Sequence, residues 1–458
     1  MRVRNIVLPV KIALLLPGRA AAHASDQAFV LLLPTNVYSA AGVAAVVLTV
    51  LALFLVPAQA MRSLFQPVTL TAPPMRGLEA ATSLTALAAM LFLITIGLNG
   101  PRDPLSNLMT LGFWTIWWVG LVILAGFAGD LWRWLNPWTG LWHVLGAGAP
   151  VWRLPGWLGT WPAAALLAAF YAFLLADIAP DDPARLAILV GSYWVITLAG
   201  LVLFGRGWLM RVEFVSVLFS LIGALATLRL TRRGGVGMPG WRLLEVKPAT
   251  GTALFALVLL AGGSFDGINE TFWWLAQIGI NPLAFPGRSA VVWPTLIGLG
   301  LSIMALIGVF AATIWLGMVL AGERARFGTA FRLLALSLLP IAFGYHIAHY
   351  TTVVLVGGQY TIAALSDPWS SGADHLGIQP FYVTTGFFNH LDSVRLIWLT
   401  QAAAVVIGHV WAVLLAHRMA LDLFEAPRRA VLATLPLSIF MIGYTFLGLW
   451  LLAAPRDA

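Results

Sequence analysis

The sequence has 458 residues, of which 60% are hydrophobic and 10% charged, and its mean hydropathy is +0.90. Soluble globular chains carry about 25% charged residues because their surface faces water, so this composition excludes a soluble domain and predicts a chain solvated by lipid. The net charge of +8 does not indicate a nucleic-acid partner, since Arg and Lys lie in short segments between apolar runs. Cysteine is absent, which excludes disulfides, thiolate metal ligands and Cys nucleophiles.

The first residues have the composition of a targeting segment. Two arginines precede the mostly apolar stretch Ile6–Pro17, and Ala22-His23-Ala24 has the small-x-small form of a signal peptidase site. We therefore predict a signal peptide over residues 1–24 and a single integral membrane domain over residues 25–458. An uncleaved first helix is the alternative, although its basic residues would make it a poor span. Cleavage would remove His23, which is left out of any predicted site.

Ten apolar runs farther along the chain approach the length of a transmembrane helix. A helix needs about 20 apolar residues to cross the hydrocarbon core of a bilayer. The runs predict an all-α polytopic transmembrane helix bundle of about ten spans, with the lipid bilayer as its main partner. In chain order they are Tyr38–Pro57, Ala80–Leu98, Leu108–Gly129, Trp157–Ile178, Arg185–Gly205, Thr250–Ser264, Ser289–Leu320, Phe331–Leu355, Arg395–His417 and Ala430–Ala453.

The charges between these runs predict which loops face the cytoplasm. Loops rich in Arg and Lys stay on the cytoplasmic side of the membrane. If the first residue of the mature chain lies outside the cytoplasm, the basic loops fall in the cytoplasm and the acidic Asp181-Asp182 loop falls outside. This arrangement requires that the apolar run Phe214–Leu228 does not cross the membrane. We predict that this run is interfacial or re-entrant and that both ends of the mature chain lie outside. The Trp-rich stretch Asp130–Pro155 is expected at the interface, and Tyr360–Ser393 as an ordered outer loop.

Histidines are concentrated in the last third of the chain. Of the eight in the sequence, five lie from position 346 to position 409. The first two are three residues apart and project from one helix face, two more lie in the following loop, and one lies in the next helix. Ionisable groups inside a membrane tend to mark function. We expect a shared metal site, with a proton or substrate pathway and structural hydrogen bonding as alternatives. The five are His346, His349, His375, His390 and His409.

Three carboxylates are candidates for catalytic roles beside these histidines. Asp266 and Glu270 are four residues apart, so a helix would present both on one face. Gly262-Gly263 and Asn281-Pro282 on either side of them predict a broken helix, which is tolerated at membrane depth only inside protein or beside water. Asp392 lies in the predicted outer loop. Each could orient a ligand imidazole or act as a general base, although the first pair could instead only cap a helix end.

The residue types of this cluster limit the metals that it could hold. Imidazole and carboxylate ligands without thiolate suit Zn, Fe, Mn or Cu(II). A bound divalent metal lowers the pKa of its water toward 7 and supplies a nucleophile. The sequence contains no HExxH, Gly-x-Ser-x-Gly or Walker signature, so a divalent transition metal of open identity is expected rather than a known motif.

Five segments of the chain carry a resemblance to a known group of proteins. They are Ala22–Ser25, Phe29–Thr35, Leu135–Trp138, Tyr345–Tyr350 and Gly408-His409. With these segments the chain resembles bacterial polytopic membrane proteins described as fenitrothion hydrolases, which are hydrolases of organophosphate triesters. The resemblance implies phosphotriester hydrolase activity in the bacterial inner membrane.

The leading hypothesis is a metal-dependent hydrolase of phosphotriester-type substrates with a His/carboxylate site that faces the periplasm. Two other classes stay open. A membrane permease or metal-handling protein would use the same groups as ion ligands or proton relays. A b-type haem protein would take two histidines from facing helices as axial ligands.

Overall fold

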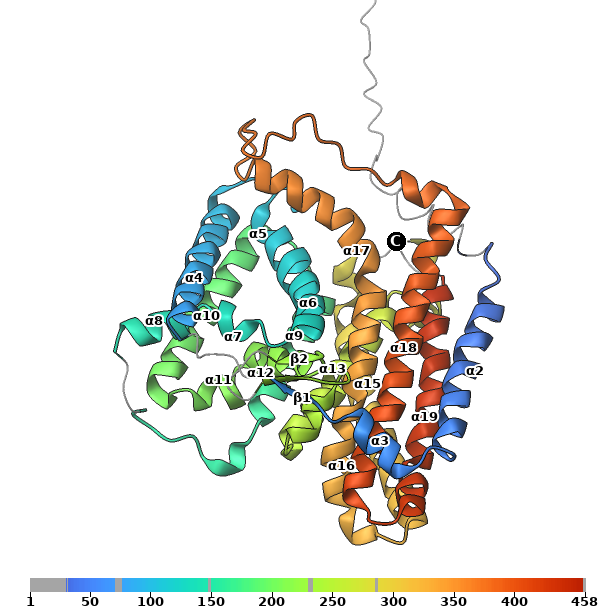
Figure 1. The fold of residues 1–458 in the computed structure, drawn as a ribbon. Helices are drawn as coiled ribbons and strands as arrows, with labels where there is room; N and C mark the ends of the chain where they lie inside the picture. The colour runs from blue at the N-terminus through green and yellow to red at the C-terminus, as the bar shows by residue number, and fades with distance from the viewer. Residues whose placement is uncertain are drawn as a thin grey trace, which may run out of the picture.

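The computed structural model shows an all-α polytopic bundle (Figure 1). Within the part of the chain that it describes, nine helices are long and apolar enough to cross a membrane, and the protein is therefore a multi-pass membrane protein. The predicted signal peptide, residues 1–24, lies outside the described part. The described residues are 30, 32–70, 76–146, 150–229, 234–284 and 287–455.

The long helices follow the predicted runs. A tenth apolar helix, α9 (Trp161–Ala176), has 16 residues and is about 24 Å long. The predicted all-α bundle of about ten spans is therefore confirmed. The nine long helical runs are α2 (Thr35–Leu53), α4 (Arg76–Asn99), α5–η1–α6 (Leu108–Ala128), α10 (Pro183–Phe204), α13 (Thr250–Asn269), α15 (Arg288–Leu320), η5–α16–η6–α17 (Arg324–Ser366), α18 (Leu391–Leu423) and α19 (Pro427–Ala453).

Shorter elements connect or subdivide these helices. Two of the long runs are composite, because η1 (Gly112–Leu121) is a π-helix between α5 (Leu108–Leu111) and α6 (Val122–Ala128), and η6 (Leu336–Leu338) joins α16 (Phe327–Ala335) to α17 (Leu339–Ser366). The remaining short helices are α3 (Ala58–Leu64), α7 (Trp132–Leu135), α8 (Thr139–Val144), η2 (Gly156–Leu158), α11 (Gly207–Arg211), α12 (Phe214–Gly223), η3 (Trp241–Glu245), α14 (Phe272–Gln277), η4 (Pro282–Ala284), η5 (Arg324–Arg326) and η7 (Gly386–Asn389).

The bounds of α10 show how local sequence sets a helix in this bundle. The Asp182 side chain accepts a hydrogen bond from the backbone N–H of Arg185 at 2.8 Å, and Pro183 occupies the first turn, where its missing N–H is not needed. The helix ends at Gly205, whose φ of 64° favours glycine. The uninterrupted apolar sequence between these signals forms the span.

The run Phe214–Leu228 does not form a spanning helix. Its helix α12 has ten residues, about 15 Å, which is half of the hydrocarbon thickness. The chain then enters a small antiparallel sheet of order β1-β3-β2. The length of α12 agrees with the expectation that this run does not cross by itself, which stays a prediction. The strands are β1 (Val68–Leu70), β2 (Leu228–Arg229) and β3 (Gly234–Val236).

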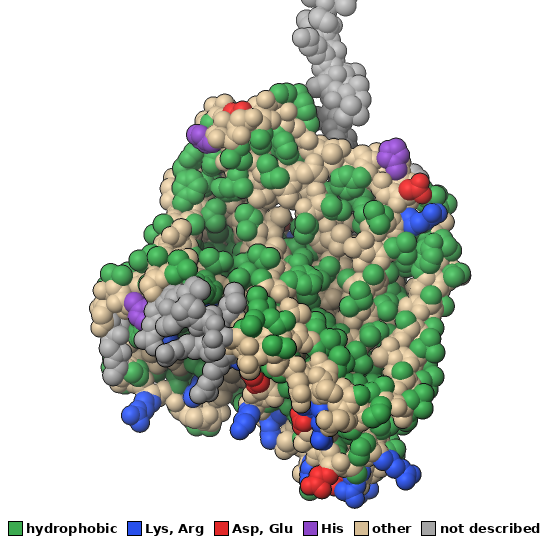
Figure 2. Space-filling view, viewed as in Figure 1, with side chains coloured by type: hydrophobic (Ala, Val, Ile, Leu, Met, Phe, Trp, Pro, Cys, Tyr) green, Lys and Arg blue, Asp and Glu red, His purple; other side chains and the backbone are tan. Residues whose placement is uncertain are grey.

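The two ends of the bundle carry different charges. At one end, Arg326 donates to the Leu423 carbonyl and Arg429 pairs with Glu323 at 2.7 Å. Lys and Arg side chains gather along this end, which lies at the bottom of Figure 2 and is called the arginine end below. At the opposite end, called the α17–α18 end, the Phe272 N–H donates to the carbonyl of Pro455, and residues 367–390 connect α17 to α18. The first described residues before α2 lie at this same end (Figure 1).

Helices α17 and α18 cross at two glycines, so Gly344→Ala is expected to destabilise the bundle. A Cβ on Gly344 would lie 2.4 Å from the Ala404 carbonyl oxygen, and small residues are what allow membrane helices to approach this closely. The clash is expected to remove about 1–3 kcal/mol of stability and to lower the melting temperature in detergent. Gly443→Ala in α19 is the matched control, because no atom lies within 4 Å of its Cβ position. Equal melting temperatures for the two variants would contradict the prediction.

Candidate functional site

A buried carboxylate meets an imidazole and a phenol between α13 and α17. Asp266 Oδ2 lies 3.1 Å from His349 Nε2, and both side chains are 8% exposed. The same oxygen accepts a hydrogen bond of 2.8 Å from the Tyr350 hydroxyl. We call Asp266, His346, His349 and Tyr350 the α13–α17 cluster. Asp266 thus lies beside His349, one of the two histidines that share a face of α17.

His346 is the fourth member of this cluster. It lies one turn before Tyr350, with ring centroids 4.8 Å apart, and packs edge-on against Trp118 at 5.3 Å. Trp118 belongs to η1, and π-helical turns occur frequently at functional sites. Within the described residues, His346 Nε2 is buried and has no hydrogen-bond partner. A buried acceptor or donor of this kind is rare and is available to a water molecule or a proton.

The cluster borders a small cavity of about 20 Å³. This volume admits about one water molecule. Three hydroxyls, two imidazoles and a carboxylate face it, so a proton could pass between Asp266 and a histidine directly or through one water. The polar residues that line the cavity are Tyr171, Asp266, Tyr345, His346, His349 and Tyr350.

The predicted helix break at Gly262-Gly263 is wrong. Helix α13 continues through both glycines to Asn269. Gly262 is needed for packing instead, because a Cβ there would lie 2.3 Å from the ring of Tyr171. Glu270 caps the end of α13, one turn beyond Asp266 and half-buried. The two carboxylates therefore share a face of one continuous helix, as their spacing predicts.

The other predicted residues do not join the α13–α17 cluster. His375, His390 and Asp392 lie exposed at the α17–α18 end, and the Asp392 side chain is 94% exposed beside Arg395. His409 is buried in α18, but its Nδ1 bonds the Val405 carbonyl at 2.8 Å and its ring faces Tyr444. His375, His390 and Asp392 lie at the surface, and His409 lies on a face of α18 that is turned away from the cluster. The spacing of these residues in the sequence could not reveal this.

The residues as arranged do not fit the predicted metal or haem. Among the described residues, no group of three or more His, Asp or Glu side chains could hold a metal ion. The cavity beside His346 and His349 has room for about one water molecule, far less than a porphyrin needs. The cluster instead has the geometry of a hydrogen-bonded carboxylate–imidazole pair.

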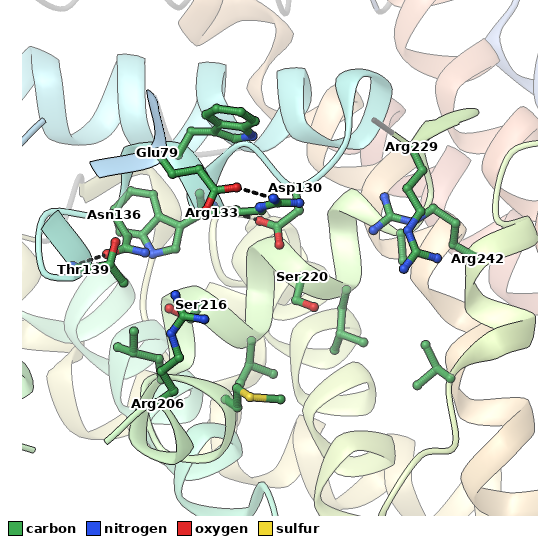
Figure 3. Close-up of a pocket in the computed structure, with 18 of the residues that line it drawn as sticks. Glu79, Asp130, Arg133, Asn136, Thr139, Arg206, Ser216, Ser220, Arg229 and Arg242 are labelled. Atoms are coloured by element: carbon green, nitrogen blue, oxygen red, sulfur yellow. Dashed lines mark hydrogen bonds and ion pairs between the residues drawn. The ribbon is translucent and has the colours of Figure 1, made fainter. Parts of the chain in front are cut away.

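A much larger cavity, of about 1440 Å³, lies on the other side of α12 (Figure 3). Its walls come from the start of α4, from α7 and α8, from the α10–α11 link and from α12. Figure 3 shows Glu79, Asp130 and Arg133 together on one wall, with Arg229 and Arg242 side by side across from them. We call this space the arginine cavity. Its charged residues are Glu79, Asp130, Arg133, Arg206, Arg229, Arg242 and Glu245.

Helix α12 forms a wall between the two cavities. Ser216, Val217, Ser220 and Leu221 line the arginine cavity. Leu218 and Ile222, on the opposite face of the same helix, line the small cavity of the α13–α17 cluster. One helix thickness therefore separates a charged vestibule from the buried titratable groups.

Glu213 is the N-cap residue of α12, the helix that forms this wall. Its carboxylate accepts hydrogen bonds from the N–H groups of Val215 at 2.8 Å and Ser216 at 2.6 Å, and from the Tyr193 hydroxyl. The residue is 1% exposed, and burial raises the pKa of its carboxyl while these hydrogen bonds partly offset that rise. At the other end of α12, Arg242 Nη1 donates to the Gly223 carbonyl at 2.7 Å.

Sequence reasoning missed Glu213, Tyr350 and the arginine cavity. Tyr350 belongs to the Tyr345–Tyr350 segment that carries the resemblance, but the sequence assigned it no role. The Trp-rich stretch Asp130–Pro155 was assigned to the interface, whereas Trp132 and Trp142 line the cavity. The usable signal was Glu213 itself, a lone carboxylate directly before an apolar run, in the position of a helix N-cap.

Comparison with models of protein families, with curated proteins and with solved structures finds no match for this chain. The class of multi-pass membrane protein therefore follows from the helices, and function has to be argued from the two cavities.

Proposed function

We propose that the protein is a membrane permease that couples the movement of a solute to protons, with the α13–α17 cluster as its proton-binding group. The observation that carries the proposal is the 3.1 Å contact between Asp266 and His349 on two neighbouring spans. A carboxylate inside a membrane helix bundle requires a partner or water, and such pairs serve as proton relays in pumps and transporters. Tyr350 on the same oxygen holds the carboxylate in place for the exchange.

The position of α12 supports transport over hydrolysis. Permeases build their solute pathway around short, discontinuous helices beside a central site. Here a ten-residue helix separates a cavity of about 1440 Å³ from the proton-binding group. A modest displacement of α12 would join the two spaces, which is the movement that alternating access requires.

The test uses the full chain reconstituted in liposomes that contain a trapped pH dye. When the outer solution is acidified, we expect the lumen to acidify faster with a transported solute than without it, across a panel of phosphate esters, carboxylates, amino acids and metal cations. Protein-free liposomes are the control, and a chelator is expected to leave the coupling intact for the solutes that are not metal cations. Acidification equal to that of protein-free liposomes with every solute would overturn the proposal.

Metal-dependent phosphotriester hydrolysis, which the resemblance implies, is the second candidate. It would need a third ligand to join His349 and Asp266, and the exposed Asp392 would have to act in the same site. Stoichiometric metal in the purified protein, with hydrolysis of a p-nitrophenyl phosphotriester that Asp392→Asn abolishes, would support the hydrolase against the permease.

We also propose that the protein lies in a bacterial inner membrane with the arginine end in the cytoplasm and the α17–α18 end in the periplasm. The gathering of Lys and Arg at one end supports this orientation. Because the chain has no cysteine, Leu376→Cys and Ala325→Cys each create the sole thiol, and both positions are exposed. An impermeant maleimide is expected to label Leu376→Cys in intact spheroplasts and Ala325→Cys only after lysis. The reverse pattern would invert the orientation.

A further inference from the structure

The charges in the arginine cavity do not cancel. Arg133 pairs with Glu79, and Arg229 Nη1 lies 2.6 Å from Glu245 Oε2. Within the described residues, Arg206 has no carboxylate partner, whereas Arg242 donates to the backbone of α12 and its charge interacts with Asp130 and Glu245. One guanidinium charge, that of Arg206, is thus left over in a space that opens to one end of the bundle.

The remaining carboxylate of the cavity does not offset this excess. Asp130 accepts a hydrogen bond from the Arg133 N–H at 3.2 Å, and burial raises the pKa of its carboxyl. The local balance stays positive even when Asp130 is counted as ionised, with four arginines against three carboxylates (Glu79, Asp130 and Glu245).

Two of the arginines repel each other. Arg229 and Arg242 lie side by side in Figure 3, and burial together with the charge of Arg229 lowers the pKa of Arg242. An anion between them would relieve the repulsion, and guanidinium groups match phosphate oxygens in a bidentate geometry. Arg206 lies beside Ser216, on the opposite side of the cavity from Arg229 and Arg242 (Figure 3).

The walls of the arginine cavity also suit the organic part of a ligand. Trp132, Trp134 and Trp142 line it beside the charged residues. Ser220 on α12 adds an exposed hydroxyl, and the volume is many times that of a phosphate ion. Guanidinium groups and indole rings in one cavity fit a phosphate group that carries a small organic substituent.

We propose that the arginine cavity binds a phosphate-bearing anion, with Arg206, Arg229 and Arg242 as its guanidinium donors. As a statement about the transported solute, this rests on the proposed permease function. The phosphate could belong to a water-soluble ester that enters from the arginine end, or to the headgroup of a lipid. Binding to the cavity requires no transport step, so it is measured separately.

The test measures binding to the full chain in a phosphate-free detergent by intrinsic Trp fluorescence. The probes are inorganic phosphate, glycerol 3-phosphate, a short-chain phosphatidic acid and succinate. We expect saturable binding of a phosphate probe and not of succinate, and a loss of about tenfold in affinity for Arg206→Gln. Arg395→Gln, at the α17–α18 end, is the control and is expected to bind as the wild type does.

The probes distinguish a soluble phosphate ester from a lipid headgroup, and the variants distinguish a failure of the binding proposal from a failure of the permease proposal. Binding of glycerol 3-phosphate supports a soluble ester, and binding of phosphatidic acid alone supports a lipid headgroup. Arg242→Gln removes a contact with α12 and could unfold it, whereas Arg206 makes no such contact, so Arg206→Gln decides the result. No binding of any phosphate probe, equal binding of succinate, or unchanged affinity in Arg206→Gln would overturn the inference. Solute-coupled acidification of liposomes alongside such a result would leave the permease function standing.

Discussion

Asp266→Asn is expected to abolish solute-coupled proton movement and to leave the protein folded. Asparagine has the shape of aspartate and can still accept from Tyr350 and contact His349, but it cannot bind or release a proton. Uptake into the lumen of liposomes driven by a pH gradient should fall to the level of protein-free liposomes. The melting temperature in detergent should change little, because the hydrogen bonds at Oδ2 are retained.

Two further variants test whether the effect of Asp266→Asn on transport comes from the loss of a proton-binding group and not from a change in packing. Tyr350→Phe removes one hydrogen bond from the carboxylate and is expected to shift the pH dependence of transport while activity remains. Asp422→Asn, a partly exposed carboxylate at the arginine end, is the matched control and should behave as the wild type does. Full coupled transport in Asp266→Asn would remove the α13–α17 cluster from the mechanism.

The spans could be predicted from the sequence because the physics behind them is local. About 20 consecutive apolar residues specify a membrane helix whatever surrounds them, so α4, α10 and α18 follow their predicted runs. The i, i+3 spacing of His346 and His349, and the i, i+4 spacing of Asp266 and Glu270, likewise set which residues share a face.

The neighbours within the α13–α17 cluster could be predicted from the sequence only where the residues lie on the same helix. Whether His409 turns toward His349 or toward Tyr444 depends on the rotation of α18 against α17, which the close approach at Gly344 and Gly408 sets. Whether His375 reaches the bundle depends on the path of a long loop. The arginine cavity is assembled from segments far apart in the chain, and no local pattern marks it.

Glu213→Ala is expected to loosen α12 and to open a leak between the two cavities. The substitution removes the acceptor of two backbone N–H groups and one of the hydrogen-bond partners of the Tyr193 hydroxyl. The loss of a helix cap costs about 0.5–2 kcal/mol, and each buried polar group left unpaired costs about 1–3 kcal/mol. We expect a lower melting temperature in detergent and, in liposomes, acidification of the lumen without any added solute.

The matched control for this leak is Glu425→Ala, which removes an exposed carboxylate at the arginine end. Glu213→Gln keeps an acceptor for the cap and is expected to melt at a higher temperature than Glu213→Ala. Because burial raises the pKa of Glu213 above its ordinary value of 4.5, its proton stabilises the folded state most below that pH, and this contribution is lost as the pH rises through the raised pKa. The wild type and Glu213→Gln should therefore converge in melting temperature as the pH is lowered toward 4.5. If Glu213→Ala melts and leaks as Glu425→Ala does, α12 is not the wall that separates the solute cavity from the proton-binding group.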